Sequence, residues 1–415
     1  MKEWVTNHVG YPLFILLEWF NMFTLPKIEK ITRDAAITHF FLMFGYKLFS
    51  LYFPLFLVAK SFSLPQIGYT NFLIYLPIAL FAPLVGFLNH RINPAVLAAV
   101  GVLGYGAYAL AMILFPNLFI FYLFQAILGI SASLFFVSSR AMMMGSKLEN
   151  PSRAFAWFYS APFYADAIAP AVGALLIWKF DFIGVFIFSL ILQFFNAIFC
   201  FVKLKNQTSH LTENVKITES GQNYLKVFKS LKTKSILFPV LASFLVLILA
   251  GFNNTFFVLF LKNLGWSQNQ ILIFNSLLSF IFLPISLWAI KQVARFKSET
   301  NVFRGAQITG IFSLLLGSFA SILNFYSVFI IMIGKYLGGL MAGAGRSGMM
   351  AAKLKGYPEE SAAIDTIFSP LATALGALIG GLIIVSFGYP LIFVLGGIII
   401  FTSGFLGERF RVVKK

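Results

Sequence analysis

Long apolar segments alternate with short polar ones along almost the whole chain. Each apolar segment has about 20 residues, the length that a helix needs to cross the hydrocarbon core of a bilayer. Proline, glycine and asparagine mark the intervals between them, as at Asn93-Pro94 and Gly388. We therefore predict twelve membrane-spanning helices, at residues 35–58, 68–88, 95–115, 118–139, 155–178, 182–202, 236–261, 271–290, 305–323, 328–345, 363–385 and 389–406.

An additional apolar run, residues 11–25, precedes the first predicted span. It is short, it carries Glu18 in its middle, and no small-residue cleavage site follows it. This pattern favours an interfacial helix over a thirteenth span or a signal peptide.

One long polar segment, residues 203–235, separates the first six spans from the last six. It carries seven lysines, and we interpret it as a solvated linker, with contact to anionic lipid as the alternative. The predicted organisation is an N-terminal cytoplasmic or interfacial segment (1–34), an N-terminal six-helix bundle (35–202), a cytoplasmic linker (203–235), a C-terminal six-helix bundle (236–407) and a cytoplasmic tail (408–415).

Composition and charge support a membrane protein. Apolar residues make up 59% of the 415 positions and charged residues 11%, against about a quarter charged in soluble domains. Lysine and arginine concentrate in the termini, the linker and every second loop, whereas the other loops carry Lys60, Lys179 and Lys262. The positive-inside rule then predicts a multi-pass protein of the cytoplasmic (plasma or inner) membrane with both termini in the cytoplasm. The net charge of +17 therefore needs no nucleic-acid partner.

The two halves of the chain are related in sequence. Residues 53–73 align without gaps with residues 257–277, and the aligned pairs include polar ones that composition alone does not explain. A weaker similarity aligns Arg140-Ala-Met-Met with Arg346-Ser-Gly-Met-Met. The polar identities are Ser63 with Ser267, Gln66 with Gln270, and Asn71 with Asn275.

Four regions of the chain carry short motifs: residues 51–57 together with 63–68, residues 86–91, residues 150–153 and residues 165–174. In order and spacing they resemble the first outer loop, the inner-loop signature, the loop before helix five and the helix-five signature of the major facilitator superfamily of secondary transporters. The resemblance extends over almost the whole chain. It implies an all-α polytopic membrane protein with twelve transmembrane helices in two pseudo-symmetric six-helix bundles, which works by alternating access around a midplane site.

The resemblance also implies gating residues. Gly86 and Arg91 keep two positions of the inner-loop signature, and Arg153 lies in the loop before helix five. His90 stands where the family has an aspartate, so the charges of this gate differ from the family pattern. Gln125 replaces the arginine typical of proton-driven drug exporters, which argues against that subgroup.

Three charged residues fall near the middle of predicted spans: Lys47, Asp166 and Lys335. A charge there is costly, so each is a candidate functional residue. The resemblance places Lys47 and Lys335 on opposite walls of the central cavity, an arrangement that favours an anionic substrate. Asp166 suits either a structural pair with Lys47 or a proton-coupling role. Lys335 has no evident acidic partner at its depth, so substrate contact is favoured over snorkelling to the surface.

Other polar residues in the spans complete the candidate set. His39 is a second proton-coupling candidate, with interfacial hydrogen bonding as the alternative. Arg140 and Arg346 end their spans on the cytoplasmic side and are interpreted as topology anchors. The uncharged candidates for substrate binding, for which helix-to-helix hydrogen bonding is the alternative, are Gln125, Tyr46, Asn253, Asn254 and Tyr336.

The sequence therefore predicts a secondary active transporter of a small organic solute, anionic or an amphipathic metabolite, with proton coupling open. It has no phosphate-binding loop, metal cluster or nucleophile triad, so we expect no cofactor, no metal and no enzyme activity. The expected partners are a small-molecule substrate, protons and membrane lipids, and the expected state is a monomer. The alternatives are a multidrug or small-molecule exporter and a non-transporting lipid-modifying enzyme or scaffold.

Overall fold

The computed structural model describes residues 25–50, 53–61, 64–114, 118–208 and 217–412. These residues form α-helices joined by short turns, together with one 3₁₀ helix, η2 (Ala320–Ile322). Apart from Leu25, the predicted interfacial segment 11–25 lies outside the described residues. The helices are α3 (Lys30–Ser50), α4 (Phe53–Ala59), α5 (Leu64–Arg91), α6 (Pro94–Leu114), α7 (Leu118–Met144), α8 (Pro151–Thr208), α9 (Ile217–Leu231), α10 (Lys234–Asn263), α11 (Gln268–Arg295), α12 (Ser298–Ser318), α13 (Phe325–Lys353) and α14 (Pro358–Val412).

The helix lengths reproduce the predicted pattern of spans. Kinks divide α8 and α14 in two, so that, with α4 and α9 set aside, twelve long helical segments are described. By length and composition alone, eight helices among the described residues are apolar enough to cross a membrane. One of them, α8, has 58 residues, which correspond to about 87 Å of helix, enough to cross a membrane twice. The protein is thus an all-α polytopic membrane protein.

Both kinks lie at backbone conformations with positive φ. Asp181 has φ 59° and its side chain accepts a hydrogen bond from the Phe182 backbone N–H at 2.7 Å. Gly388 has φ 75°, a value that glycine adopts without steric penalty, and Pro390 follows it. The sequence predicted a turn between spans at both places.

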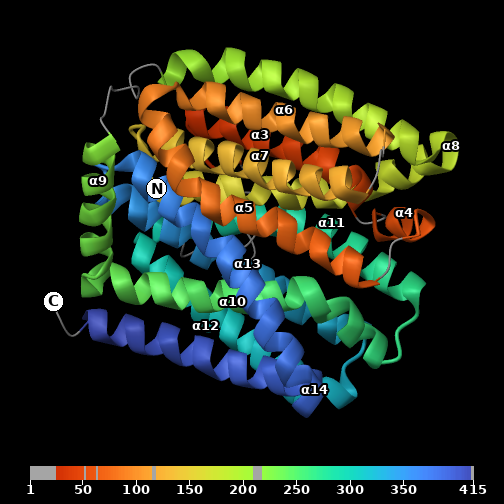
Figure 1. Ribbon diagram of the computed structural model, residues 1–415. Helices are drawn as coiled ribbons and strands as arrows, with labels where there is room; N and C mark the ends of the chain where they lie inside the picture. Colours follow the sequence, from red (N-terminus) through yellow and green to blue (C-terminus); the bar gives the residue numbers. More distant parts are fainter. Residues whose placement is uncertain (1–24, 51–52, 62–63, 115–117, 209–216, 413–415) are drawn as a thin grey trace, which may run out of the picture.

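Two six-helix bundles pack side by side (Figure 1). We call α3 and α5–α8 the first bundle and α10–α14 the second. Each bundle repeats the same close approach: Gly173 on α8 abuts the Leu48 carbonyl on α3, and Gly376 on α14 abuts the Ile248 carbonyl on α10. A side chain at either glycine would collide with backbone, so these small residues set the helix spacing in both bundles.

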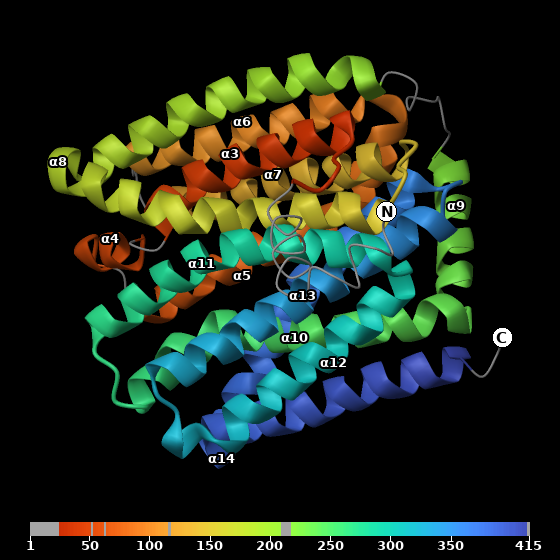
Figure 2. The ribbon, with the colours of Figure 1, turned by 180° about the vertical axis from the view of Figure 1, so that it is seen from behind.

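Helix α9 lies across one end of both bundles, within the segment predicted as a solvated linker (Figures 1 and 2). We call this end the α9 end and the opposite one the α4 end. On one side the Tyr224 hydroxyl donates to the Pro83 carbonyl of α5 at 2.8 Å, and on the other the Lys226 ammonium lies 5.6 Å from the Tyr357 ring centre, next to α14. Val227 of the same helix is fully buried. The linker therefore contains a packed helix, although the domain boundaries themselves stay predictions.

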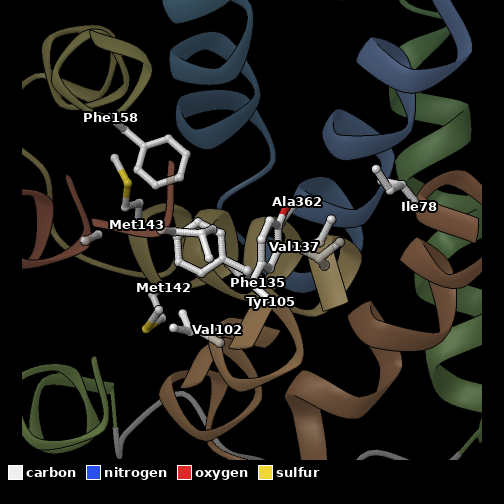
Figure 3. Close-up of a cluster of buried hydrophobic side chains, with 14 of the residues drawn as sticks. Ile78, Val102, Tyr105, Phe135, Val137, Met142, Met143, Phe158 and Ala362 are labelled. Carbon is white, nitrogen blue, oxygen red and sulfur yellow. The ribbon is translucent and has the colours of Figure 1, made fainter. Parts of the chain in front are cut away.

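The buried core extends from the first bundle into the second (Figure 3). Phe135 and Val137 of α7 lie beside Ala362, which belongs to α14. Apolar packing therefore joins the bundles where α14 begins, close to the α9 end. The other labelled members of this cluster are Ile78, Val102, Tyr105, Met142, Met143 and Phe158.

Candidate functional site

Lys47 and Asp166 form an ion pair between α3 and α8 of the first bundle. The Lys47 ammonium lies 2.9 Å from Asp166 Oδ1. Each side chain is 31% exposed, so the pair is not sealed in the core. Asp166 lies three residues after Phe163 on α8, whose ring centre is 5.5 Å from that of Tyr336 on α13. The structure therefore contains the pairing that the sequence allowed and places it close to a contact between the bundles.

Lys335 is held inside the second bundle. It is 4% exposed, which excludes snorkelling to the surface in this state. Its ammonium donates to Asn253 Oδ1 at 3.1 Å and lies 4.6 Å from the centre of the Phe393 ring. Sequence reasoning found no partner for Lys335 because it searched for an acid, and the partner is a neutral amide. Among the described residues no carboxylate forms an ion pair with Lys335.

Tyr336, one residue further along α13, points toward the first bundle. Its ring packs against Phe163 of α8 and Phe282 of α11, with ring centres 5.5 and 5.6 Å away. Beside these rings the Ser286 hydroxyl donates to the Tyr164 hydroxyl at 3.0 Å. Tyr336 thus belongs to an aromatic contact between the bundles, next to Asp166.

Three other predicted substrate contacts have different surroundings. Gln125 is fully buried and donates to the Tyr108 hydroxyl at 3.0 Å, so its amide is engaged within the first bundle. Tyr46 packs edge-on against Phe49 and Tyr105 of the same bundle. Asn254 is exposed on α10, next to Asn253.

His39, the second proton-coupling candidate, lies inside the first bundle. Its Nδ1 is 2.9 Å from the Phe158 carbonyl, and its ring centre lies 4.4 Å from that of the Phe158 ring. Phe135 and Phe136 enclose the ring from the α7 side. These contacts fit a role in holding α3, α7 and α8 together.

A buried polar network joins the bundles near the α9 end. Asp365 on α14 is fully buried and accepts from Arg346 Nε at 2.6 Å and from the Ser347 hydroxyl at 2.6 Å. From the first bundle, Arg140 Nε lies 3.6 Å from the same carboxylate and the Tyr159 hydroxyl donates to it at 3.3 Å. The interpretation of Arg140 and Arg346 as topology anchors is therefore wrong. The signal available in the sequence was their alignment in the internal repeat.

The inner-loop signature makes a second contact between the bundles. His90 Nε2 lies 2.8 Å from Glu360 Oε1 at the start of α14. Gly86, one turn earlier on α5, faces Ala363 and the Tyr224 hydroxyl so closely that a larger side chain would collide with both. The guanidinium of Arg91, the third position, lies 4.8 Å from the Phe87 ring centre. Gly86 thus permits the close approach of α5, α9 and α14.

Arg153 lies at the start of α8 and ties loops together at the same end. It pairs with Glu29, before α3, at 2.8 Å and with Glu149 at 3.3 Å. Hydrogen bonds from Lys27 and Arg153 hold the pKa of the Glu149 carboxyl below its usual value. Nearby, the Ser152 hydroxyl donates to the Ser298 hydroxyl of α12 at 2.8 Å. Together with the Asp365 network and His90, these contacts close the α9 end.

Known proteins share both the sequence pattern and the fold. The sequence model of the Major Facilitator Superfamily matches residues 35–364. No curated protein shows significant sequence similarity to the chain. Among solved structures, the human organic anion transporter MFSD10 is similar with a TM-score of 0.72 at 14% identity, over 91% of this chain and 99% of that one.

Two further structures are similar over most of their lengths. A bacterial homologue of the iron transporter ferroportin in an outward-facing state gives a TM-score of 0.69 at 15% identity, over 91% of this chain and 99% of that one. The proton:xylose symporter XylE gives 0.68 at 15% identity, over 92% and 95%. At such identities the likeness establishes the fold. Taken with the family match over most of the sequence, it shows that the chain belongs to the major facilitator superfamily and is a multi-pass membrane transporter.

Proposed function

We propose that this transporter carries a small organic anion, or an amphipathic metabolite with an anionic group, by alternating access as a monomer. The observation that carries the proposal is Lys335, a buried ammonium whose contacts in the described residues are an amide oxygen and an aromatic ring. An amide and a ring face attract a cation, but neither neutralises it. A substrate anion would supply the missing charge.

Energetics support this assignment. A lysine at the centre of a membrane helix costs roughly 2.5–3.5 kcal/mol on insertion scales, so such a residue is expected to have a function. Lys47, the other cation at this depth, already has Asp166 as its partner. Lys335 is therefore the better candidate for direct contact with the substrate anion. The ring of Phe393 beside it suits the apolar part of an amphipathic molecule.

The direction of access follows from which end is closed. The buried charged contacts between the bundles lie near the α9 end, and the positive-inside rule assigns that end to the cytoplasm. We therefore infer a state that is closed toward the cytoplasm. Transport would require the Asp365 network and the His90–Glu360 contact to separate.

Proton coupling is assigned to Asp166. Protonation of this carboxylate would remove its charge and break the ion pair with Lys47. Because the pair is partly exposed and lies about one turn from Phe163, whose ring contacts Tyr336 of the second bundle, such a change would alter the contact between the bundles. A purely structural pair with Lys47 is the alternative.

A ligand screen with charge-matched pairs tests the proposed substrate class. Purified protein is heated with a library in which each carboxylate is accompanied by its neutral amide or ester, and stabilisation is measured as a shift in Tm, since a ligand of the native state raises apparent stability. We expect anionic members to stabilise the parent protein and to lose that effect in Lys335→Gln. Equal stabilisation by the neutral analogues, in parent and variant alike, would reject an anionic substrate.

A further inference from the structure

Three metal-ligating side chains from opposite bundles meet at the α9 end. His90 ends α5, and Glu359 and Glu360 begin α14. His90 Nε2 lies 2.8 Å from Glu360 Oε1, and its Nδ1 lies 3.9 Å from Glu359 Oε2. One ligand atom from each residue lies within 4.8 Å of the other two. All three residues are more than nine-tenths buried, so the cluster is part of the interface between the bundles.

The donor set suits a first-row divalent cation. Zinc, manganese and ferrous ions accept imidazole nitrogen and carboxylate oxygen together. One ligand atom from each residue lies within 4.8 Å of the other two, and a rotation of the Glu359 side chain would bring both carboxylates to the same imidazole nitrogen. The two carboxylates bring more negative charge than one imidazole can neutralise. A divalent cation would balance this charge in a setting where burial makes it costly.

A helix N-terminus alone explains part of the arrangement. Acidic residues in the first turn of a helix are stabilised by its dipole, and both glutamates occupy the first turn of α14. That effect does not account for the second carboxylate oxygen of Glu360. This atom, Oε2, is buried and accepts no hydrogen bond. A buried carboxylate oxygen without a donor is an unusual feature, and the other oxygen of the same carboxylate contacts the imidazole.

We propose that His90, Glu359 and Glu360 bind a divalent transition-metal ion that fastens α5 to α14. Because the ligands come from different bundles, the site is complete only while the α9 end is closed. A ligand shifts a conformational equilibrium by its difference in affinity for the two states. The ion would therefore stabilise the closed α9 end and slow transport without touching the substrate site.

Zinc binding to the purified transporter tests the site directly. Protein stripped with a chelator is titrated with Zn²⁺ by calorimetry, and its thermal unfolding is followed with and without the ion. We expect saturable binding and a higher Tm in the parent protein. Glu360→Gln and His90→Gln should weaken Zn²⁺ binding at least about tenfold, because even groups outside the first ligand shell change metal affinity by 10–100-fold.

Matched variants separate the cluster from incidental binding. His210→Gln removes a histidine of the linker segment and Glu149→Gln an exposed carboxylate, and both should bind Zn²⁺ like the parent. His90→Cys keeps a zinc ligand and should retain the Tm increase that His90→Gln loses. No saturable binding to the parent, or the same binding in all five variants, would overturn the proposal.

A distance measurement tests the conformational effect. Cys200, the sole native cysteine, is buried, so spin labels can be attached at Ile92→Cys and Lys355→Cys, two exposed positions on either side of the interface. Zn²⁺ should increase the population with the shorter label separation, and the Glu360→Gln background should abolish this response. A distribution that does not change with Zn²⁺, or that shifts to longer distances, would show that the ion does not hold the bundles together.

Discussion

Arg140 and Arg346, aligned in the two halves of the sequence repeat, converge on one carboxylate. Arg346 Nε contacts Asp365 Oδ1 at 2.6 Å, and Arg140 Nε reaches its Oδ2 at 3.6 Å from the opposite bundle. The symmetric arginines therefore share an acid that the second bundle alone provides. Because the three charges are buried across the interface, this network is well placed to decide how long the α9 end stays closed.

Removing the shared acid should open this end. Asp365→Asn leaves two buried guanidinium groups facing one another without a counter-charge, which costs about 3–5 kcal/mol in the closed state. We expect a lower Tm and a larger population open at the α9 end. A cysteine placed at Ala362, which is fully buried near the start of α14, should react faster with a thiol reagent in the Asp365→Asn background.

The matched control removes an acid from a more exposed ion pair. Glu149 pairs with Lys27 at 2.6 Å, and the two side chains are 58% and 68% exposed. Glu149→Gln should change stability far less than Asp365→Asn, because water screens an exposed pair. If Asp365→Asn has the same small effect and leaves the labelling rate unchanged, the network does not control the closed state.

The orientation of the protein can be checked by labelling from one side of the membrane. Tyr326, in the first turn of α13, is exposed at the α4 end, and Thr218 is exposed on α9. In intact cells a cysteine at Tyr326 should react with an impermeant thiol reagent, whereas one at Thr218 should react only after the membrane is permeabilised. The reverse pattern would place the linker and both termini outside and would refute the charge-based orientation.

The spans were predictable because their signal is local. Twenty apolar residues, a change to basic loops and the turn residues near Asp181 and Gly388 suffice to locate the helices. The pairing of Lys47 with Asp166 was also accessible, since two opposite charges at the same depth of one bundle have few other partners. The depth of a charged residue in the membrane can be read from its position within the predicted span.

The rotation of each helix about its axis is harder to infer. Arg140 and Arg346 lie near helix ends, where a basic residue ordinarily reaches the lipid headgroups, and only the tertiary packing turns them toward Asp365. Likewise, a search for charged partners cannot find Asn253 as the acceptor for Lys335. Helix α9 was missed because its residues are polar on average, although its apolar positions recur with helical spacing.

The Lys47–Asp166 pair should reveal its role through single and double neutralisation. If the pair is structural, Asp166→Asn or Lys47→Gln alone should lower the stability of the protein. Because both side chains are partly exposed, the loss should exceed the ~0.5 kcal/mol of a surface pair and stay below the ~3–5 kcal/mol of a buried one. The double variant should then recover most of the loss. The measurement is thermal unfolding of all four proteins.

Proton coupling predicts a different pattern for the same variants. Reconstituted Asp166→Asn should exchange substrate down its concentration gradient but no longer accumulate it when a proton gradient is imposed. His39→Gln serves as the control, because its ring is enclosed in the first bundle and should affect stability rather than accumulation. Undiminished accumulation by Asp166→Asn would remove this carboxylate from the coupling mechanism.

Asn253 offers a test of the anion site that leaves Lys335 in place. The substitution Asn253→Asp converts the amide oxygen 3.1 Å from the ammonium into a carboxylate, so that the protein itself neutralises the lysine. A substrate anion then loses its attraction to Lys335 and is repelled by the new acid. We expect anion binding to weaken by about 2 kcal/mol, roughly thirtyfold, while a neutral analogue binds almost unchanged.

The neighbouring amide provides the control for this last substitution. Asn254→Asp adds the same charge one residue away, on an exposed position of α10 that makes no described contact with Lys335. Asn254→Asp should reduce anion affinity much less than Asn253→Asp does. Only Asn253→Asp should also raise the Tm, because the new carboxylate completes a buried ion pair with Lys335 whose geometry is already set. Titrations of one matched ligand pair against the three proteins decide the matter. If both aspartates weaken anion binding equally, the effect is long-range repulsion, and Lys335 does not hold the substrate anion.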